Sequence, residues 1–141
     1  MDLLGRREPA IYGDSSLEKI NKDLRLKADL LGLSVEIFQS NHEGDIVDEI
    51  GKATKKFDAL IINPAAYTHT SIAIADAINA CGVPAIEVHL SNIYAREDFR
   101  RQSMIAPVAA GQISGFGAGS YQLALEAVRF VFAKKSRRTP S

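Results

Sequence analysis

Two short segments of this chain combine the residue types that proton-transfer chemistry needs. Residues 86–90 form a hydrophobic run that contains an acid and a histidine, Glu87 and His89. Residues two apart on a β-strand point to the same face, so these two side chains would lie together. Residues 5–13 contain two arginines and a tyrosine among glycine and proline, which is typical of a loop. An acid–histidine pair facing an arginine-flanked tyrosine indicates general acid–base chemistry.

The composition limits the classes of protein to consider. A chain of 141 residues suits one domain with a single core, so we predict one domain over residues 1–141. Lys+Arg and Asp+Glu both number 17, so no net field favours nucleic acid or an anionic membrane as partner. The single cysteine, Cys81, excludes a disulfide framework and a cysteine-based metal site, and it fits a reducing compartment. No apolar stretch approaches the about 20 residues of a membrane span, and we predict a cytoplasmic protein.

Strand-like and helix-like segments alternate along the chain. Capping patterns predict helices that begin at Ser15-x-x-Glu18, at Ser40-x-x-Glu43, and at Thr70 or Ser71, with glycine stops at Gly32 and Gly82. Apolar runs predict strands over 34–39, 59–63, 85–89 and 110–115, a short helical turn over 95–102, and a last helix over 119–134. Strands separated by helices predict a parallel sheet covered on both faces.

The beginning of the chain departs from this alternation. Doubly wound units start with a strand that leads into the first helix, but residues 1–13 contain no strand pattern. We therefore expect a five-stranded α/β domain whose first, central strand is missing, which would leave its two neighbours with unpaired edges. A four-stranded sheet that begins with a helix is the alternative. Residues 1–13 are predicted to be a loop over the active site, and residues 134–141 a basic, solvated tail.

The motifs resemble those of one enzyme family. They occupy residues 3–13, 38–44, 62–71, 86–99 and 115–117, in order over nearly the whole chain. By these motifs the chain resembles the type II 3-dehydroquinate dehydratases of the shikimate and quinate pathways. The resemblance implies a flavodoxin-like doubly wound parallel sheet with helices on both faces. The family normally has an upstream strand that ends in Asn-Gly-Pro-Asn, and here Ala65, Ala75 and Tyr94 replace its usual Gly, Arg and His.

The resemblance also implies a reaction and its catalytic residues. The family converts 3-dehydroquinate to 3-dehydroshikimate by anti elimination of water through an enolate, without a cofactor, metal or covalent intermediate. Tyr12 resembles the base that removes the C2 proton, and Arg7 and Arg96 resemble the arginines that favour its phenolate. His89 resembles the acid that protonates the departing C1 hydroxyl, and Glu87 the carboxylate that orients this histidine.

The resemblance implies substrate-binding residues and an assembly as well. Asn63 and the backbone of Leu90 and Ser91 would hold the substrate carboxylate. His69 and Arg100 would bind the ring hydroxyls. Asp76 matches a residue that reaches the active site of a neighbouring subunit, because the family forms trimers arranged into a dodecamer.

Structural roles remain open for several of these residues. His89 at a strand end suits a buried structural histidine, Asn63 suits a strand terminus, and Arg96 and Arg100 are four apart, as on a solvated helical face. A non-catalytic flavodoxin-like protein that oligomerises or binds a small carboxylate is the alternative function. The glycines of residues 115–119 weakly suggest a flavin- or nucleotide-binding module, but a tight turn explains them better.

Overall fold

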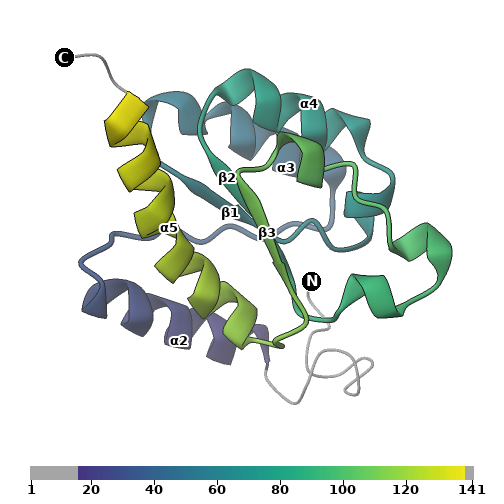
Figure 1. The fold of residues 1–141 in the computed structure, drawn as a ribbon, viewed down its shortest axis with the longest axis horizontal. Helices are drawn as coiled ribbons and strands as arrows, with labels where there is room; N and C mark the ends of the chain where they lie inside the picture. The colour runs from purple at the N-terminus through teal and green to yellow at the C-terminus, as the bar shows by residue number, and fades with distance from the viewer. Residues whose placement is uncertain (1–15, 139–141) are drawn as a thin grey trace.

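The centre of the molecule is a parallel sheet of three strands in the order β1-β2-β3 (Figure 1). The computed structural model describes residues 16–138, apart from the side chains of residue 100 and residues 133–138. The strands are β1 (Leu60–Ile62), β2 (Ala85–His89) and β3 (Gly111–Ser114). The helices are α2 (Leu17–Leu30), α3 (Glu43–Gly51), α4 (Ile72–Cys81) and α5 (Gly119–Arg138). The predicted α/β class with a parallel sheet is confirmed.

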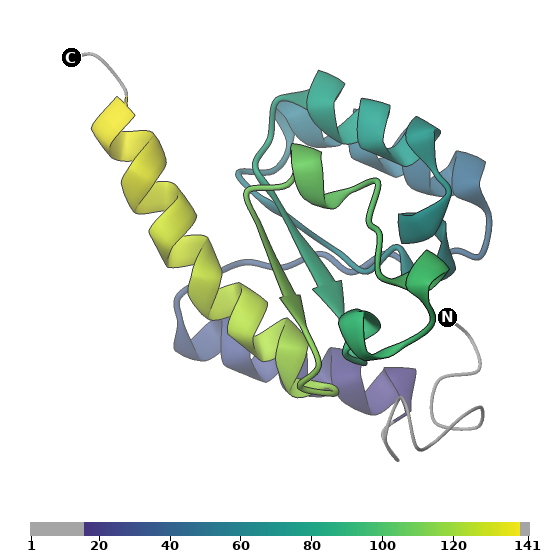
Figure 2. The same ribbon diagram turned by 45° about the vertical axis from the view of Figure 1, so that its right-hand side comes forward.

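The helices cover both faces of the sheet, as Figures 1 and 2 show. On one face, Ile50 of α3 and Ile74 and Ile78 of α4 form a core cluster with Ala85. On the other face, Ala124 and Val128 of α5 pack against Ile86 and Val88, and α2 packs against α5 through Leu24, Ala28 and Leu125. Burial of both faces explains why every residue of β2 is buried.

The predicted helices are present, with boundaries shifted by up to four residues, and two predicted caps are wrong. The N-cap of α2 is Ser16, whose hydroxyl accepts from the Lys19 backbone N–H at 3.2 Å, so the capping pair lies one residue later than expected. The N-cap of α3 is His42, which makes no side-chain cap bond. Ser40 instead accepts from the His42 N–H and donates to Asp45 at 2.9 Å. Its hydroxyl therefore closes the turn before the helix.

The other helix ends are confirmed. Ser71 caps α4 by accepting from the Ile74 N–H at 3.0 Å. Gly32 and Gly82 follow α2 and α4 with φ of 71° each, a conformation that glycine adopts without a Cβ clash.

The predicted strand over 34–39 is not formed. The segment is extended, and its side chains alternate between exposed and partly buried, as in a strand. Val35 and Ile37 pack on the α2–α5 cluster and on Ile61. No strand in the described part of the chain lies beside the segment to complete a ladder, so it has a strand's burial pattern without a strand's hydrogen bonds.

The edge strand β1 is shorter than predicted. It spans three residues, all partly exposed, and among the described strands β2 is the one that pairs with it. The predicted turn over 95–102 consists of two short 3₁₀ helices, η3 (Ile93–Ala95) and η4 (Asp98–Arg100). Further 3₁₀ turns are η1 (Ala53–Lys55), η2 (Ala65–His69) and η5 (Ala106–Val108). The last helix continues to Arg138, so the basic run after Lys134 lies on its final turns.

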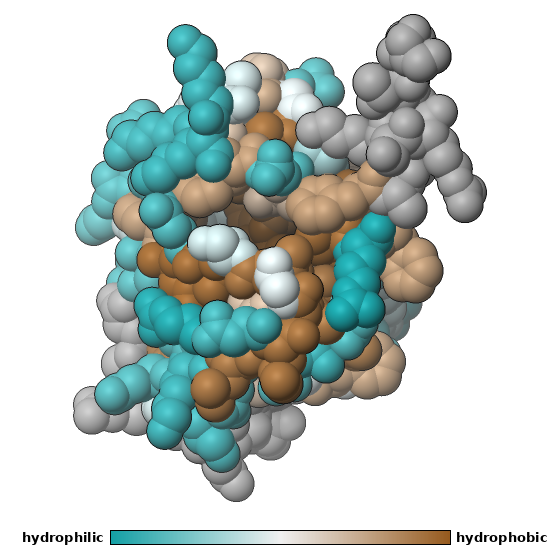
Figure 3. All heavy atoms as spheres, turned by 90° about the vertical axis from the view of Figure 1, so that its left-hand side faces the viewer, coloured by the Kyte–Doolittle hydropathy of each residue, from teal (hydrophilic) through white to brown (hydrophobic). Residues whose placement is uncertain are grey.

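The two ends of the sheet differ in character. Seen from the side where the strands begin, hydrophobic residues surround a hollow beside the C-terminal half of α5 (Figure 3). The polar cluster described below lies at the opposite end, where β2 finishes. Among the described helices, none is both long and apolar enough to cross a membrane.

Candidate active site

The predicted acid–histidine pair is formed at the carboxyl end of β2. Glu87 Oε2 lies 2.5 Å from His89 Nε2, and the two side chains have exposed fractions of 0% and 5%. Both point to the same face because they are two apart on a regular strand. The carboxylate binds Nε2, and the other ring nitrogen, Nδ1, has no hydrogen-bond partner among residues 16–138.

Two hydroxyl side chains that the sequence reasoning missed complete the surroundings of the carboxylate. Thr68 donates to Glu87 Oε2 at 2.5 Å. Ser103 lies 2.9 Å from both carboxylate oxygens and itself accepts from the Ile105 and Ala106 backbone N–H groups. Because these N–H groups occupy the lone pairs of Ser103, its hydroxyl hydrogen points to Glu87.

The backbone fixes the two hydroxyls in place. Thr68 is on η2 and Ser103 lies ahead of η5, and the Met104 N–H donates to the Thr68 carbonyl at 2.7 Å. Thr68 is fully buried. The sequence contains one general signal for these partners, namely that a buried carboxylate requires donors, but it does not indicate which of the many hydroxyls supply them.

The hydrogen bonds keep Glu87 ionised although it is buried. Burial alone would raise the pKa of this carboxyl group, but the donors His89, Thr68 and Ser103 and the positive charge on His89 outweigh burial and hold the pKa below its ordinary 4.5. A buried carboxylate of this kind stabilises an imidazolium and fixes the orientation of its ring.

The ends of the neighbouring strands bring further predicted residues to the same edge of the sheet. Asn63 follows β1, and Leu90 and Ser91 follow β2. The Gly117 N–H donates to the Leu90 carbonyl at 2.9 Å, and the Gly115 N–H to the His89 carbonyl at 3.3 Å. The Leu90 side chain is buried, so its backbone is what it can offer to a ligand. In open parallel sheets this edge is where ligands bind.

The side chain of Asn63 is held on both sides. Its Nδ2 donates to the Tyr121 hydroxyl at 2.9 Å, and its Oδ1 accepts from the Ala65 N–H at 3.0 Å. The second N–H of the amide has no bond within the described residues and is available to a ligand. Burial raises the pKa of Tyr121 above its ordinary 10, despite the bond to Asn63, so this phenol is neutral at physiological pH.

The remaining predicted residues are placed as follows. His69 ends η2, with Nδ1 2.7 Å from the Gln102 carbonyl, and Arg96 is partly buried between η3 and η4. Asp76 is exposed on α4, and among the described residues no hydrogen bond or ion pair joins it to Glu87. Arg100 belongs to η4, but its side chain is not described, and Arg7 and Tyr12 lie outside the described residues.

The glycine-rich turn after β3 has the structural role that the sequence favoured. Gly115 and Gly117 have φ of 100° and 58°. A Cβ on Gly115 would lie 3.3 Å from the Asn92 Cβ, so the turn packs closely against the end of β2.

The fold is an α/β protein with a parallel sheet, and a buried acid–histidine pair at the carboxyl edge of that sheet is its candidate active site. The family model described as dehydroquinase class II matches residues 1–129. The chain belongs to this family.

Individual relatives agree with this assignment. The chain is 58% identical to a 3-dehydroquinate dehydratase of Acaryochloris marina, covering 91% of this chain and 86% of the relative. It is also 58% identical to a 3-dehydroquinate dehydratase of Caldicellulosiruptor bescii, covering 92% and 90%. Among solved structures, the type II dehydroquinase of Butyrivibrio crossotus superposes with a TM-score of 0.89 at 41% identity, covering 91% of this chain and 90% of that one.

Proposed function

We propose that this chain is a type II dehydratase that converts 3-dehydroquinate to 3-dehydroshikimate by anti elimination through an enolate. The observation that carries this proposal is the buried Glu87–His89 pair at the carboxyl end of β2. The family membership and the names of the relatives support the substrate.

Proton abstraction is assigned to Tyr12. Its phenolate takes the proton from C2 of the substrate, and the electron pair moves onto the C3 carbonyl to form the enolate. A free tyrosine has a pKa of about 10, so the base requires nearby cations that favour the phenolate. Arg7 and Arg96 are the proposed cations.

Loss of water is assigned to His89. The imidazolium gives its Nδ1 proton to the C1 hydroxyl, the C1–O bond breaks, and the enolate electrons form the C1=C2 double bond. The products are the conjugated enone and water, and solvent returns Tyr12 and His89 to their starting protonation states. Glu87 holds the ring by Nε2 and stabilises its charge, and this position suits an acid that must be protonated before each turnover.

Substrate binding is assigned to the residues around this pair. The free N–H of Asn63 and the backbone at Leu90 and Ser91 hold the carboxylate, while His69 and Arg100 bind the ring hydroxyls. Asp76 lies exposed on α4, which suits a residue that acts in the site of a neighbouring subunit. We accordingly propose that twelve copies of the chain, arranged as trimers, form a dodecamer in the cytoplasm, without cofactor or metal.

The experiment is an ultraviolet assay for enone formation from 3-dehydroquinate, with the wild-type chain and two variants. Tyr12→Phe removes only the proton acceptor and should abolish turnover while substrate still binds. Tyr67→Phe is the matched control, because its hydroxyl donates to the Asn41 carbonyl away from Glu87, and it should retain activity. A folded wild-type chain that binds substrate but forms no enone would overturn the proposal in favour of a non-catalytic member.

A further inference from the structure

One hydrogen bond at the carboxyl edge of the sheet joins a proposed substrate-binding residue to a side chain that has no assigned role. Asn63 Nδ2 donates to the Tyr121 hydroxyl at 2.9 Å, across 58 residues of sequence. The strand register pairs Ile62 with Glu87, so Asn63 lies one residue further along, beside the end of the strand that carries His89. We infer that Tyr121 is a positioning residue, which holds the Asn63 amide so that its remaining N–H faces the carboxylate of the bound substrate. The substrate carboxylate comes from the proposed function, on which this role for Tyr121 rests.

The two contacts of the Asn63 amide fix its orientation. The Ala65 N–H can only donate, so the amide oxygen faces it at 3.0 Å and the amide nitrogen faces Tyr121. The terminal torsion of an asparagine side chain is soft, and one contact leaves the amide plane free to turn. The second contact, at Tyr121, fixes this plane and with it the direction of the second N–H.

Tyr121 is itself held firmly by the core. Its side chain packs against three of the core clusters, which contain Ile20 and Leu90, Leu24 and Ala28, and Ile86 and Val88. Because interiors are close-packed, a ring held among α2, α5 and the sheet has little room to turn. Its hydroxyl is therefore a fixed point against which the Asn63 amide is aligned.

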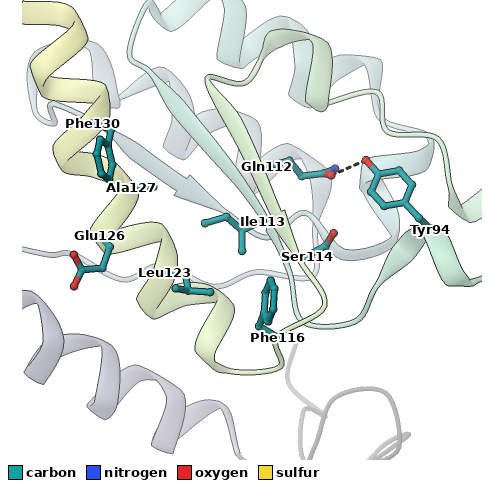
Figure 4. A pocket seen from close by; sticks show the side chains of 9 residues that line it. All are labelled: Tyr94, Gln112, Ile113, Ser114, Phe116, Leu123, Glu126, Ala127 and Phe130. Carbon is teal, nitrogen blue, oxygen red and sulfur yellow. Dashed lines mark hydrogen bonds between the residues drawn. The ribbon is translucent and has the colours of Figure 1, made fainter.

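The place of Tyr121 on α5 directs it toward the sheet. At about 100° per residue, Leu123 and Phe130 lie about half a turn of the helix away from it. Figure 4 shows these two side chains at the open groove beside β3. Tyr121 is therefore on the opposite, inward side of α5, in agreement with its bond to Asn63.

The beginning of α5 links the two groups that are proposed to hold the substrate carboxylate. The Gly117 N–H donates to the Leu90 carbonyl at 2.9 Å, just before the helix begins. Tyr121 lies in the first turn of the helix and contacts the Asn63 side chain. One short segment thus holds the Leu90 backbone and the Asn63 amide in place relative to each other.

The charge state of Tyr121 suits a carboxylate ligand. Burial raises the pKa of this phenol above its ordinary 10, despite the bond from Asn63. A phenolate at this position would repel a bound carboxylate. The neutral hydroxyl accepts from Asn63 without adding a negative charge to the site.

Steady-state kinetics of Tyr121→Phe measure the effect on the substrate. The substitution keeps the ring in the core and removes only the acceptor for Asn63 Nδ2. A hydrogen bond to a charged group contributes about 10- to 100-fold in affinity, and a loosened bond loses part of this. KM should therefore rise about 10-fold while kcat changes less than about two-fold. Tyr67→Phe is the matched control, because its hydroxyl donates to the Asn41 carbonyl, and it should retain both constants. A wild-type KM in Tyr121→Phe would overturn the inference.

A double-mutant cycle tests whether Tyr121 acts through Asn63. In an Asn63→Ala background, Tyr121→Phe should raise KM no further, because the amide that the tyrosine positions is gone. Equal increases in KM with and without Asn63 would show that Tyr121 supports only the fold, contrary to the inference.

Nuclear magnetic resonance of the Asn63 side-chain amide tests the contact without substrate. Its ¹⁵N relaxation should show a rigid amide in the wild type and in Tyr67→Phe, and a mobile amide in Tyr121→Phe. An equally rigid amide in Tyr121→Phe would refute the positioning role. A wild-type chain that forms no enone, but whose Asn63 amide becomes mobile in Tyr121→Phe, would refute the proposed function and support the positioning of Asn63 by Tyr121.

Discussion

Glu87 accepts a hydrogen bond from His89 Nε2 at 2.5 Å, and every described polar group around this carboxylate is a donor. An ionised carboxylate can only accept, so the cluster matches the charged form of Glu87 and disfavours any neutral replacement. The pair is therefore arranged to hold an imidazolium in one orientation. This arrangement leads to the first two predictions.

Glu87→Gln should lower kcat by about 100-fold with little change in KM. The amide keeps the volume of the carboxylate but removes its charge, and its NH₂ group faces hydroxyl and ring N–H donors that need an acceptor. General acid catalysis contributes about 10²–10⁴-fold, and a poorly oriented, less basic imidazole loses much of it. Steady-state kinetics measure the effect.

Glu49→Gln is the matched control for that substitution. Glu49 forms a surface pair with Lys52 at 3.5 Å on α3, far from β2 in sequence, and its replacement should leave kcat unchanged. An active Glu87→Gln enzyme with wild-type kcat would contradict the role of the carboxylate in orienting His89.

Thr68→Val should destabilise the fold in a manner that depends on pH. The hydroxyl bond to Glu87 is one cause of the lowered pKa of this group, and hydrogen bonds to charged groups contribute about 1.5–3 kcal/mol. A carboxyl group whose pKa is lower in the folded state than in the unfolded state stabilises the fold at pH values above its unfolded-state pKa, ordinarily near 4.5. This stabilisation is lost as the pH falls through the folded-state pKa. The difference in unfolding free energy between wild type and Thr68→Val should therefore be largest at neutral pH and shrink below about pH 4.5.

Urea unfolding across this pH range measures that difference, and Thr68→Ser is the control. Serine keeps the donor and loses only a methyl group, so it should restore most of the pH-dependent part. A stability loss in Thr68→Val that is constant with pH would show that packing, and not the bond to Glu87, is what the substitution removes.

The sequence predicted the elements that have complete local signals. Val88 and its neighbours form a buried strand because both faces of β2 are covered. Ser71 caps the start of α4 and Gly82 ends it, which are positions that serine and glycine commonly occupy. The segment over 34–39 shows where such signals fail. Its apolar alternation is real, but a strand also requires a neighbouring backbone, which periodicity within the segment does not reveal.

The site was predictable in part for the same reason. Glu87 and His89 are two apart on one strand, so local geometry brings them together. Thr68 and Ser103 reach the carboxylate from turns 19 and 16 residues away in sequence, and only the tertiary fold brings them there. The Ser15 and Ser40 caps were misplaced because several hydroxyl and polar residues near each helix start can close the same turn.

Ala65→Gly should stabilise the fold by about 0.5–1 kcal/mol. Ala65 has a φ of 52°, and the bond from its N–H to the Asn63 side chain holds the turn in this conformation. A non-glycine residue in the left-handed region costs about 1–2 kcal/mol, and glycine removes this cost. Glycine loses more conformational entropy on folding than alanine, which cancels part of the gain. Thermal unfolding measures the gain.

Ala66→Gly provides the contrast within the same turn. Ala66 is exposed on η2 and is not among the described residues with positive φ, so glycine there brings only its entropic cost of about 0.5–1 kcal/mol. Equal losses of thermal stability in Ala65→Gly and Ala66→Gly would show that the backbone at Ala65 is not strained in solution.

Gly115→Ala should destabilise the fold and reduce activity together. At a φ of 100° an alanine is strained, by about 1–3 kcal/mol, and its Cβ would lie 3.3 Å from the Asn92 Cβ. The Gly115 N–H donates to the His89 carbonyl, so relief of the clash must move the backbone that carries the proposed acid.

Gly44→Ala is the control, because nothing lies within 4 Å of its Cβ and alanine favours the helix by about 0.5–1 kcal/mol. We expect lower stability and lower kcat for Gly115→Ala, and higher stability with unchanged kcat for Gly44→Ala. Wild-type kcat in a destabilised Gly115→Ala enzyme would show that the turn after β3 supports the fold without positioning His89.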